Sequence, residues 1–253
     1  MINSVLHGDC LELMKNIPDG SVDMILCDLP YQVTACKWDT IIPFEPMWEQ
    51  YNRIIKKSGV IALFGSEPFS SSLRSSNLKK YKYDLYWLKN RPTGMAYARF
   101  QPMRKIENVC IFFEGKSIYN PIKTKRTESE LKKLSKKSVK TKKTENYNMD
   151  YGKTANRYDN EYKNPTNVLE FKCVANQGKE KLPHPTQKPV ALFEYLIKTY
   201  TNEGETVLDN CAGSGTTAIA CMNTNRNYIL MEQEKEYIDI ISKRIAEHNN
   251  PPS

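Results

Sequence analysis

A strongly apolar run, Val22–Cys27, ends in four residues that together could bind a planar amine: Asp28, Leu29, Pro30 and Tyr31. The exocyclic amine of a nucleobase such as adenine is a poor nucleophile because its lone pair is delocalised into the ring. Two acceptors, the Asp28 carboxylate and the Leu29 carbonyl, would take its two hydrogens and localise that pair. Pro30 biases Leu29 towards extended backbone, and Tyr31 offers a flat face to an unstacked base. The alternative is an ordinary strand exit with a capping Asp.

A second candidate site is the stretch 207–218, which predicts a strand, a glycine turn and the start of a helix. The glycines permit close approach of a ligand, and the helix start offers free N–H groups to an anion. The spacing Gly213-x-Gly215-x-x-Ala218 also fits a dinucleotide fingerprint, with Glu232 as the acid that binds the ribose. A phosphate-binding P-loop is disfavoured because its Lys is missing.

Asp209 closes the strand of this stretch and favours one ligand over another. Its negative charge would repel a pyrophosphate, whereas it suits a zwitterion that carries a sulfonium. S-adenosylmethionine is therefore favoured over NAD as the cofactor. A glycine turn without any ligand is the remaining alternative.

The positive charge of the chain is concentrated in one internal segment, residues 116–181. This segment holds 17 Lys and Arg against 8 Asp and Glu, so it accounts for the whole net charge of +8. A localised basic block attracts polyanions, of which nucleic acid is the commonest. Tyrosines interleaved with the charge could pack on bases. A solvated Lys-rich loop, with a basic helix or a mobile stretch at 131–143, is the alternative.

An α/β sheet must position these two sites, and the sequence predicts one on either side of the basic segment. Short β-rich runs alternate with helical stretches up to residue 115, and the alternation returns from residue 182. The expected strands are 5–6, 22–27, 60–65, 85–88, 109–113, 206–209 and 227–232, and the expected helices are 47–57, 189–200, 216–223 and 236–248.

Composition excludes several classes of protein. At 253 residues the chain can bury a real core. No apolar run approaches the roughly 20 residues that span a bilayer, and the stretch 1–9 lacks the layout of a signal peptide. The seven cysteines occur singly, without a CxxC pair. We therefore expect a cytoplasmic protein without a disulfide framework, a bound metal or a membrane partner.

The two sites, in this order, resemble those of the β group of amino DNA methyltransferases, the N6-adenine and N4-cytosine family. In that family an Asp-Pro-Pro-Tyr motif comes first, a variable recognition segment follows, and the cofactor glycine loop comes last. Here Asp28–Tyr31 precedes the basic segment, and His-Pro-Thr-Gln-Lys-Pro at 184–189 leads into 209–217. The resemblance covers about 1–115 and 182–248, and it reaches the basic segment by position only.

The resemblance implies a permuted Rossmann-like methyltransferase sheet of the α/β class, mostly parallel and seven-stranded, with an inserted basic recognition region. The expected organisation is a catalytic half at 1–115, a target-recognition insert at 116–181 and a cofactor-binding half at 182–253. In such a sheet the strand ending at Asp209 lies beside the strand ending at Asp28, so both motifs meet at strand carboxyl ends.

The resemblance also implies site-specific transfer of a methyl group from S-adenosylmethionine to N6 of adenine in double-stranded DNA, by a bacterial or phage-encoded enzyme. The expected catalytic residues are Asp28, Leu29, Pro30 and Tyr31. The expected cofactor-binding residues are Asp9, Cys10, Asp28, Thr186, Lys188, Asp209, Cys211, Gly213, Ser214, Gly215, Thr216 and Glu232. The expected nucleic-acid contacts are Trp38, Lys89, Arg91, Arg104, Lys123, Lys125 and Arg126. A homodimer and a cognate restriction endonuclease are further partners that the sequence leaves open.

Three of these assignments have structural alternatives. Asp9 could instead cap a helix over 11–15. Lys188 could be a structural cation rather than a contact to the carboxylate of the cofactor. Arg104, which could reach a phosphate, could instead pair with Glu107.

Two departures from the family pattern bear on chemistry. Leu29 stands where the family has its first Pro, but the carbonyl remains. Cys211 occupies the place of an aromatic residue that often packs near the cofactor, which predicts looser binding. Asp rather than Ser at position 28 favours adenine, with N4 of cytosine as the alternative.

Rival functions are an RNA or protein methyltransferase, an NAD-binding oxidoreductase and an inactive DNA-binding module. The first usually has its glycine loop ahead of the Pro-Tyr motif. The second depends on the glycine loop alone. The intact tetrapeptide Asp28–Tyr31 disfavours the third.

Overall fold

The computed structural model describes residues 1–31, 40–135, 161–174 and 187–250. Contacts within the chain divide it into two units, Met1–Asn120 together with Asn167–Ser253, and Pro121–Thr166. The expected site residues Trp38 and Thr186 lie outside the described residues.

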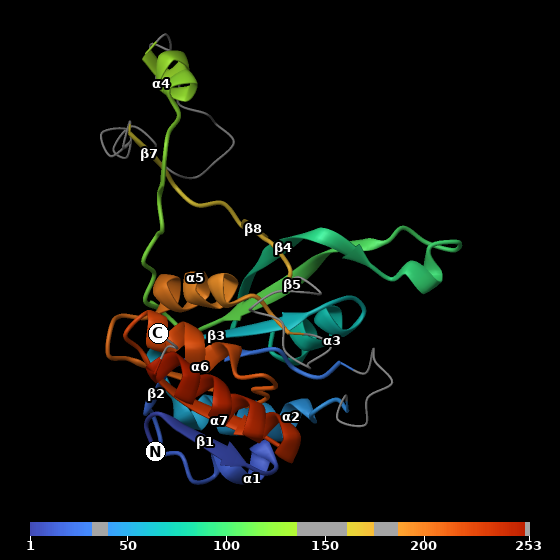
Figure 1. Ribbon diagram of the computed structural model, residues 1–253, viewed down its shortest axis with the longest axis vertical. Coiled ribbons are helices and arrows are strands. Elements are labelled where there is room, and N and C mark those ends of the chain that lie inside the picture. Colours follow the sequence, from blue (N-terminus) through green and yellow to red (C-terminus); the bar gives the residue numbers. More distant parts are fainter. Residues whose placement is uncertain (32–39, 136–160, 175–186, 251–253) are drawn as a thin grey trace. The chain divides into compact units, whose positions relative to one another are not determined.

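The larger unit is built on one twisted sheet with helices on both faces (Figure 1). In spatial order its strands are β1 (Ser4–His7), β10 (Asn227–Glu232), β9 (Thr206–Asp209), β2 (Val22–Cys27), β3 (Ile55–Gly65), β5 (Arg104–Phe112), β4 (Tyr81–Thr93) and β8 (Val168–Phe171). All neighbours are parallel except β5, which is antiparallel to β3 and β4. The predicted mostly parallel α/β sheet is confirmed.

The sheet has eight strands among the described residues, where seven were expected. The additional strand is β8, which pairs in parallel with β4 from Tyr86 opposite Val168 to Lys89 opposite Phe171. It lies in the range expected for the basic insert, where polar and charged neighbours surround its short apolar run and no strand was predicted. Its Leu169 is buried in the core of the sheet.

Helices cover both faces of this sheet. On one face lie α1 (Cys10–Met14), α2 (Phe44–Ile54) and α3 (Phe69–Ser76), and on the other lie α5 (Val190–Tyr200), α6 (Thr216–Asn223) and α7 (Lys235–Asn249). Every residue of β2 is buried, as a central parallel strand covered on both faces requires. The rings of Phe64 and Phe193 stack 5.4 Å apart under α5, and those of Trp48 and Phe112 lie 4.9 Å apart under α2.

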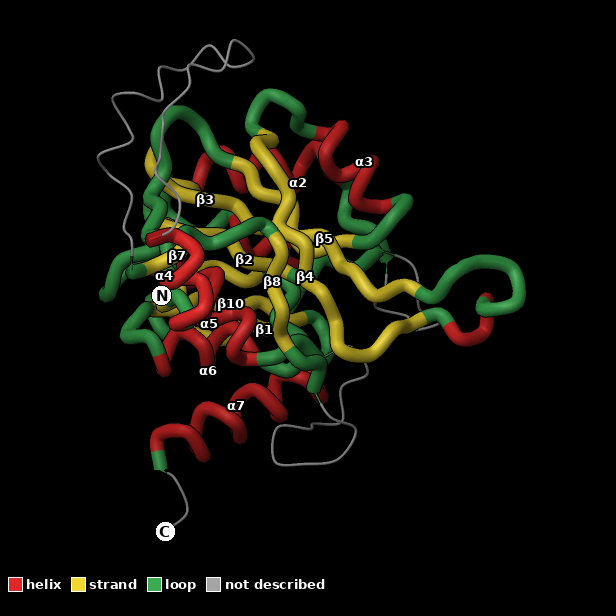
Figure 2. The backbone as a smooth tube through the Cα atoms, turned by 90° about the horizontal axis from the view of Figure 1, so that it is seen from above, coloured by secondary structure: helices red, strands yellow, loops and turns green. Residues whose placement is uncertain are grey.

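Two features of this unit differ from the expected elements. The strands expected at 85–88 and 109–113 are the central parts of β4 and β5, which continue as a hairpin closed by the 3-10 turn η1 (Met95–Tyr97) (Figure 2). The helix α3 was not expected, because its sequence is rich in serine and offers only two apolar side chains, Phe69 and Leu73, to the core.

The parallel register brings the loops after four strands to one edge of the sheet. Ile25 of β2 lies opposite Leu208 of β9, and β10 and β1 continue the sheet beyond β9. In an open α/β sheet, ligands bind outside the carboxyl ends of the strands. Asp28, which follows β2, and Asp209, which ends β9, therefore lie side by side, as the sequence predicted.

The smaller unit is described at its two ends. Its elements are β6 (Thr124–Lys125), α4 (Glu128–Ser135) and β7 (Tyr162–Lys163), and β6 pairs with β7 in antiparallel fashion. The Lys163 ammonium binds the Glu130 carboxylate at 2.8 Å, which ties α4 to β7. Most of the basic stretch 131–143 lies outside the described residues.

Candidate functional site

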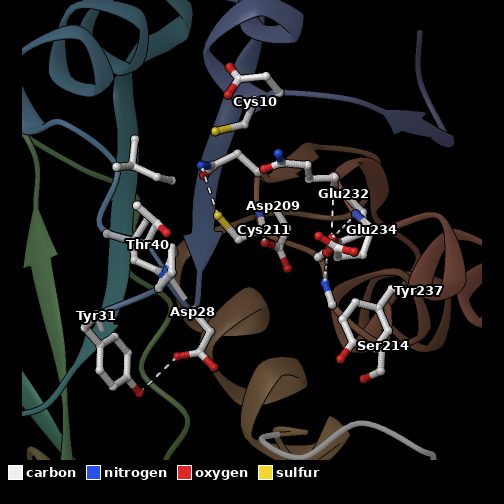
Figure 3. A pocket seen from close by; sticks show the side chains of 18 of the residues that line it. Cys10, Asp28, Tyr31, Thr40, Asp209, Cys211, Ser214, Glu232, Glu234 and Tyr237 are labelled. Carbon is white, nitrogen blue, oxygen red and sulfur yellow. Dashed lines mark hydrogen bonds between the residues drawn. The ribbon is translucent and has the colours of Figure 1, made fainter. Parts of the chain in front are cut away.

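A cavity of about 450 Å³ opens at the carboxyl edge of the sheet, a volume typical of small-molecule sites. Its walls come from the loops after β1, β2, β9 and β10, together with 40–43 and 187–188 (Figure 3). The following expected catalytic and cofactor residues line it: Asp9, Cys10, Asp28, Leu29, Pro30, Tyr31, Lys188, Asp209, Cys211, Gly213, Ser214, Thr216 and Glu232. Segments separated by about 180 positions in the sequence thus share one pocket.

Asp28 directly follows the carboxyl end of β2, and the Lys188 ammonium lies beside it. The Lys188 ammonium binds its carboxylate at 2.5 Å, and the Tyr31 hydroxyl donates to it at 3.4 Å. Burial raises the pKa of Asp28 above its usual value, while the positive charge of Lys188 opposes that rise. The ion pair therefore favours the ionised, acceptor form of this partly buried carboxylate.

Lys188 joins Asp28 to a second partly buried acid, Glu107 of β5. Its ammonium lies 3.3 Å from the Glu107 carboxylate, which also binds Lys89 at 2.9 Å. Burial disfavours the charge on Lys188, yet Asp28 and Glu107 hold its pKa well above the ordinary value. The ammonium also lies 5.3 Å from the centre of the Phe64 ring. These contacts match the structural cation that was the alternative for Lys188.

Glu107 is a member of this site that the sequence did not place there. A pair with Arg104 was one of two alternatives for it, whereas its carboxylate binds Lys89 and Lys188. Those two ammonium groups hold the pKa of Glu107 below its usual value against the effect of burial. An acidic residue in the middle of an otherwise β-rich run was the available signal, but only the fold reveals its partners.

Tyr31 is held in place by an aromatic neighbour from α3. Its ring stacks on Phe69, with the centroids 5.3 Å apart and the planes 27° apart, and Phe44 of α2 packs against Phe69 at 5.8 Å. Phe69 is buried, and Tyr31 is half-buried at the cavity wall. The strand exit thus presents a carboxylate and a supported ring to the same space.

Glu232, at the end of β10, is fixed by three backbone N–H groups. One carboxylate oxygen accepts from Gly213 at 2.7 Å, and the other accepts from Gln233 at 2.8 Å and Glu234 at 2.9 Å. Burial raises the pKa of Glu232, and the N–H donors act in the opposite direction. Each carboxylate oxygen can accept more than one bond, so the side chain retains capacity for hydroxyl groups in the cavity.

The two glycines of the turn, Gly213 and Gly215, have different roles. Gly213 lines the cavity with φ of 51°. Gly215 caps α6 with φ of 75° and is not among the residues that line the cavity. A side chain there would place its Cβ 2.9 Å from Ile241 of α7. Gly215 was expected to contact the cofactor, and its described surroundings instead show it permitting α7 to pack on the turn.

Asp9 is the helix cap that was its alternative role, and it also lines the cavity. Its carboxylate accepts from the N–H groups of Leu11 at 2.9 Å and Glu12 at 3.1 Å, at the start of α1. Cys10 at the start of α1 also lines the cavity, as does Cys211 in the glycine turn. Every cysteine that the structure describes is a free thiol.

Asp209 is the most deeply buried carboxylate of the pocket loops, at 3% exposure. Thr217 donates its hydroxyl to one carboxylate oxygen, and the N–H of Cys211 donates to the other at 3.1 Å. Burial raises the pKa of Asp209 to about 7, although these donors act in the opposite direction. The side chain is therefore close to half ionised at neutral pH.

This shift predicts how stability depends on pH. Because the pKa in the folded state exceeds the ordinary value for Asp, about 3.9, Asp209 stabilises the fold fully below about pH 4, and that contribution is lost as the pH rises through about 7. In Asp209→Asn we expect the free energy of unfolding to lose this component of its pH dependence. Denaturant titrations of both proteins between about pH 4 and 8 measure the difference. An unchanged slope would contradict the assignment.

The described residues among the expected nucleic-acid contacts differ in their exposure. Lys89 is a wrong expectation, because only 4% of it is exposed and its ammonium binds Glu107 and Thr93 inside the protein. Arg91 is exposed on the hairpin between β4 and β5. Arg104 is half-buried and donates to the Glu67 carbonyl at 3.5 Å.

In the smaller unit, Lys123 and Lys125 are exposed and Arg126 is half-buried. Lys125 lies 3.5 Å from Glu161. Pocket residues that the sequence did not indicate include Asn210 and Tyr237. The Tyr51 hydroxyl of α2 donates a hydrogen bond to the side-chain oxygen of Asn210 at 2.6 Å, so Asn210 joins the pocket to α2.

The described residues contain neither a metal-binding cluster nor a membrane-spanning helix. No cluster of His, Cys, Asp and Glu suited to a metal ion occurs among them. No helix in the described part of the chain has the length and apolarity needed to cross a membrane.

Comparison with known proteins points to one family. The DNA methylase family of N6 and N4 methyltransferases matches residues 22–243. The DNA adenine methyltransferase YhdJ of Escherichia coli (strain K12) is 30% identical over 96% of this chain and 82% of its own length. The type II methyltransferase M.HpaI of Haemophilus parainfluenzae is 27% identical over 99% and 76%. The crystal structure of the M1.HpyAVI–SAM complex superposes with a TM-score of 0.63 and 25% identity, over 96% of this chain and 98% of that one.

These matches extend across both halves of the sheet, so they include the Asp28 loop as well as the glycine turn. A family model that spans most of the chain cannot arise from one shared motif. The chain belongs to the DNA methylase family of N6 and N4 methyltransferases.

Proposed function

We propose that this DNA methylase transfers a methyl group from S-adenosylmethionine to N6 of an adenine extruded from duplex DNA, and that the reaction takes place in the cavity beside Asp28. The observation that carries the proposal is the shared cavity of the Asp28 loop and the Gly213 turn. The membership of the family agrees with the sequence-based prediction of a methyltransferase and disfavours the oxidoreductase.

The residues of β2 and its exit prepare the amine of the base. The Asp28 carboxylate accepts one amine hydrogen and the Leu29 carbonyl the other, which localises the nitrogen lone pair. Tyr31, supported by Phe69, provides the face on which the base stacks. The Lys188 ammonium favours the ionised form of Asp28. Catalysis by this chain is then mainly a matter of orientation and of a fixed acceptor.

S-adenosylmethionine, when bound, supplies an electrophilic methyl group on a sulfonium. The residues present fit such a ligand. Glu232 offers acceptor capacity for ribose hydroxyls, and Gly213 leaves its side of the cavity free of a side chain. The cavity thus offers acidic groups that accept hydrogen bonds from hydroxyls, as S-adenosylmethionine requires, and not a loop of N–H groups that would bind phosphate.

Glu232 provides a test of cofactor binding by itself. We expect Glu232→Gln to weaken the Kd for S-adenosylmethionine by roughly tenfold, because a charged acceptor is replaced by a neutral amide. Calorimetric titration of the free protein measures this without any turnover. Glu236→Gln, an exposed acid in the first turn of α7, serves as the matched control with unchanged Kd. Equal affinities for wild type and Glu232→Gln would exclude Glu232 from the cofactor site.

The choice of adenine is supported by Asp at position 28 and by the printed name of the relative YhdJ, a DNA adenine methyltransferase. The test is to express the chain in cells that lack DNA methylation and to map modified bases by sequencing. N6-methyladenine in one recurring sequence is the expected result, and it also defines the target site. Detection of N4-methylcytosine would show that cytosine is the substrate instead of adenine. Unmodified DNA would contradict the proposed function.

Recognition of the DNA target and the proposed protein partners involve other parts of the chain. We place target recognition in the basic insert 116–181, where the exposed Lys123 and Lys125 offer charge to phosphates. Relatives named type II methyltransferases support a cognate restriction endonuclease as a functional partner, and a homodimer is tested by the mass of the protein in solution. The free cysteines suit the bacterial cytoplasm.

A further inference from the structure

The hairpin that joins β4 to β5 carries an exposed apolar tip. It comprises residues 91–105 and projects beyond the rest of the larger unit (Figures 1 and 2). Met95 is 72% exposed, Tyr97 57% and Phe100 86%. A group of large apolar side chains on a projecting element indicates a surface that meets a partner.

The charge of the same hairpin identifies the class of partner. Its charged residues are Arg91, Arg99, Arg104 and Lys105, and its sequence contains neither Asp nor Glu. Arg91, Arg99 and Lys105 are exposed beside the apolar tip. Guanidinium groups bind phosphates, and aromatic rings stack on bases, so a cationic surface with exposed rings is complementary to nucleic acid.

The tip holds its own shape. Gly94 adopts φ of 92° and its carbonyl accepts the N–H of Tyr97 at 3.0 Å. The Tyr97 carbonyl then accepts the N–H groups of Phe100 at 2.9 Å and Gln101 at 3.1 Å. Because these backbone bonds close the turn, the exposed rings are presented in a defined arrangement, which lowers the entropy lost on binding.

The sheet directs the hairpin towards the side of the molecule where Asp28 lies. Gly65, the last residue of β3, pairs with Asn108 of β5, so residues 104–107 extend past the carboxyl edge of β3. At about 3.3 Å per residue they carry the tip roughly 13 Å beyond that edge. Glu107 at the base of the hairpin binds Lys188, which binds Asp28. The hairpin is therefore anchored to the ion pair of the catalytic carboxylate.

We infer that this hairpin enters the DNA at the target base pair, where Phe100 fills the space left by the extruded adenine while Arg91 and Arg99 bind the flanking phosphates. The inference rests on the proposed function. Extrusion of a base costs its stacking and pairing, and an apolar side chain inserted between base pairs recovers part of that cost. Insertion needs an exposed ring, cationic flanks and a place beside the catalytic edge, and the hairpin combines these three features.

The test compares two duplexes that contain the mapped target site. In one the target adenine faces thymine, and in the other it faces an abasic position, so that less stacking and pairing must be broken. We expect Phe100→Ala to lower kcat on the paired duplex by about tenfold or more, and to restore kcat to within about twofold of wild type on the abasic duplex. Leu78→Ala is the matched control, because Leu78 is 68% exposed but precedes β4 at the opposite edge of the sheet; it should leave kcat on both duplexes unchanged.

Other outcomes overturn the inference. An equal loss on both duplexes assigns Phe100 to a role other than opening the base pair, and an unchanged kcat on the paired duplex removes its role altogether. A loss that accompanies a change from dimer to monomer in sedimentation identifies the tip as an interface between copies. Wild-type methylation of the paired duplex shows that the proposed function stands in each of these cases, whereas its absence contradicts that function. Unchanged melting temperature and S-adenosylmethionine affinity establish that Phe100→Ala is folded.

Discussion

Replacing Asp28 by Ala should lower kcat for methyl transfer to DNA by roughly 10³-fold, while the Kd for S-adenosylmethionine stays within about threefold of wild type. The reason is that Ala removes the charged acceptor for one amine hydrogen, so the lone pair of the nitrogen remains delocalised. Lys188 keeps the Glu107 carboxylate as a partner at 3.3 Å, so the buried ammonium is not left without a counter-charge. Single-turnover incorporation of labelled methyl groups measures the chemical step directly.

The chain offers a matched control for this variant on the same strand. Asp23 is also buried, at 5% exposure, and binds Lys56 at 2.7 Å, but it lies near the amino end of β2. Asp23→Ala should lower the melting temperature and leave kcat per folded molecule unchanged. If Asp28→Ala retained wild-type kcat, the carboxylate would have no part in preparing the amine.

Lys188→Met should have the second largest effect, a loss of roughly 100-fold in kcat near neutral pH. Without the ammonium, burial and the nearby Glu107 raise the pKa of Asp28 further, so the carboxyl becomes protonated and loses its full acceptor capacity. The active form is the ionised one, so the acidic limb of the pH–rate profile moves to higher pH. The measurement is kcat/KM against pH for wild type and Lys188→Met.

Two further variants separate this electrostatic role from simple damage to the fold. Lys188→Arg retains a cation and should keep the acidic limb closer to that of wild type. Lys56→Met removes the cation from the equivalent pair at Asp23 and should leave the profile unchanged. A profile for Lys188→Met that drops in height without moving along the pH axis would mean that Lys188 supports the pocket but does not tune Asp28.

The sequence by itself determined the sheet class, the order of the motifs and half of the residues around the cavity. Val22–Cys27 is apolar except for Asp23, so its burial as a central strand followed from composition, and the next residue had to emerge at the strand end. The spacing of Gly213 and Gly215 predicted the turn before α6 in the same local way. Signals of this kind depend only on residues that are neighbours in the sequence, so they can be recognised before the fold is known.

The tertiary structure alone decided which distant charges meet. Lys89, expected at a DNA surface, is buried against Glu107, and Glu107 reaches Asp28 through Lys188. Nothing in the local sequence of these residues carries that information, because ion pairs between strands depend on register and on which edge each strand exit faces. Gly215 likewise owes its identity to Ile241 of α7. The sequence alone predicted the chemistry of the site. The charges around the Asp28 carboxylate are set only when the sheet brings β2, β5 and the residues before α5 together.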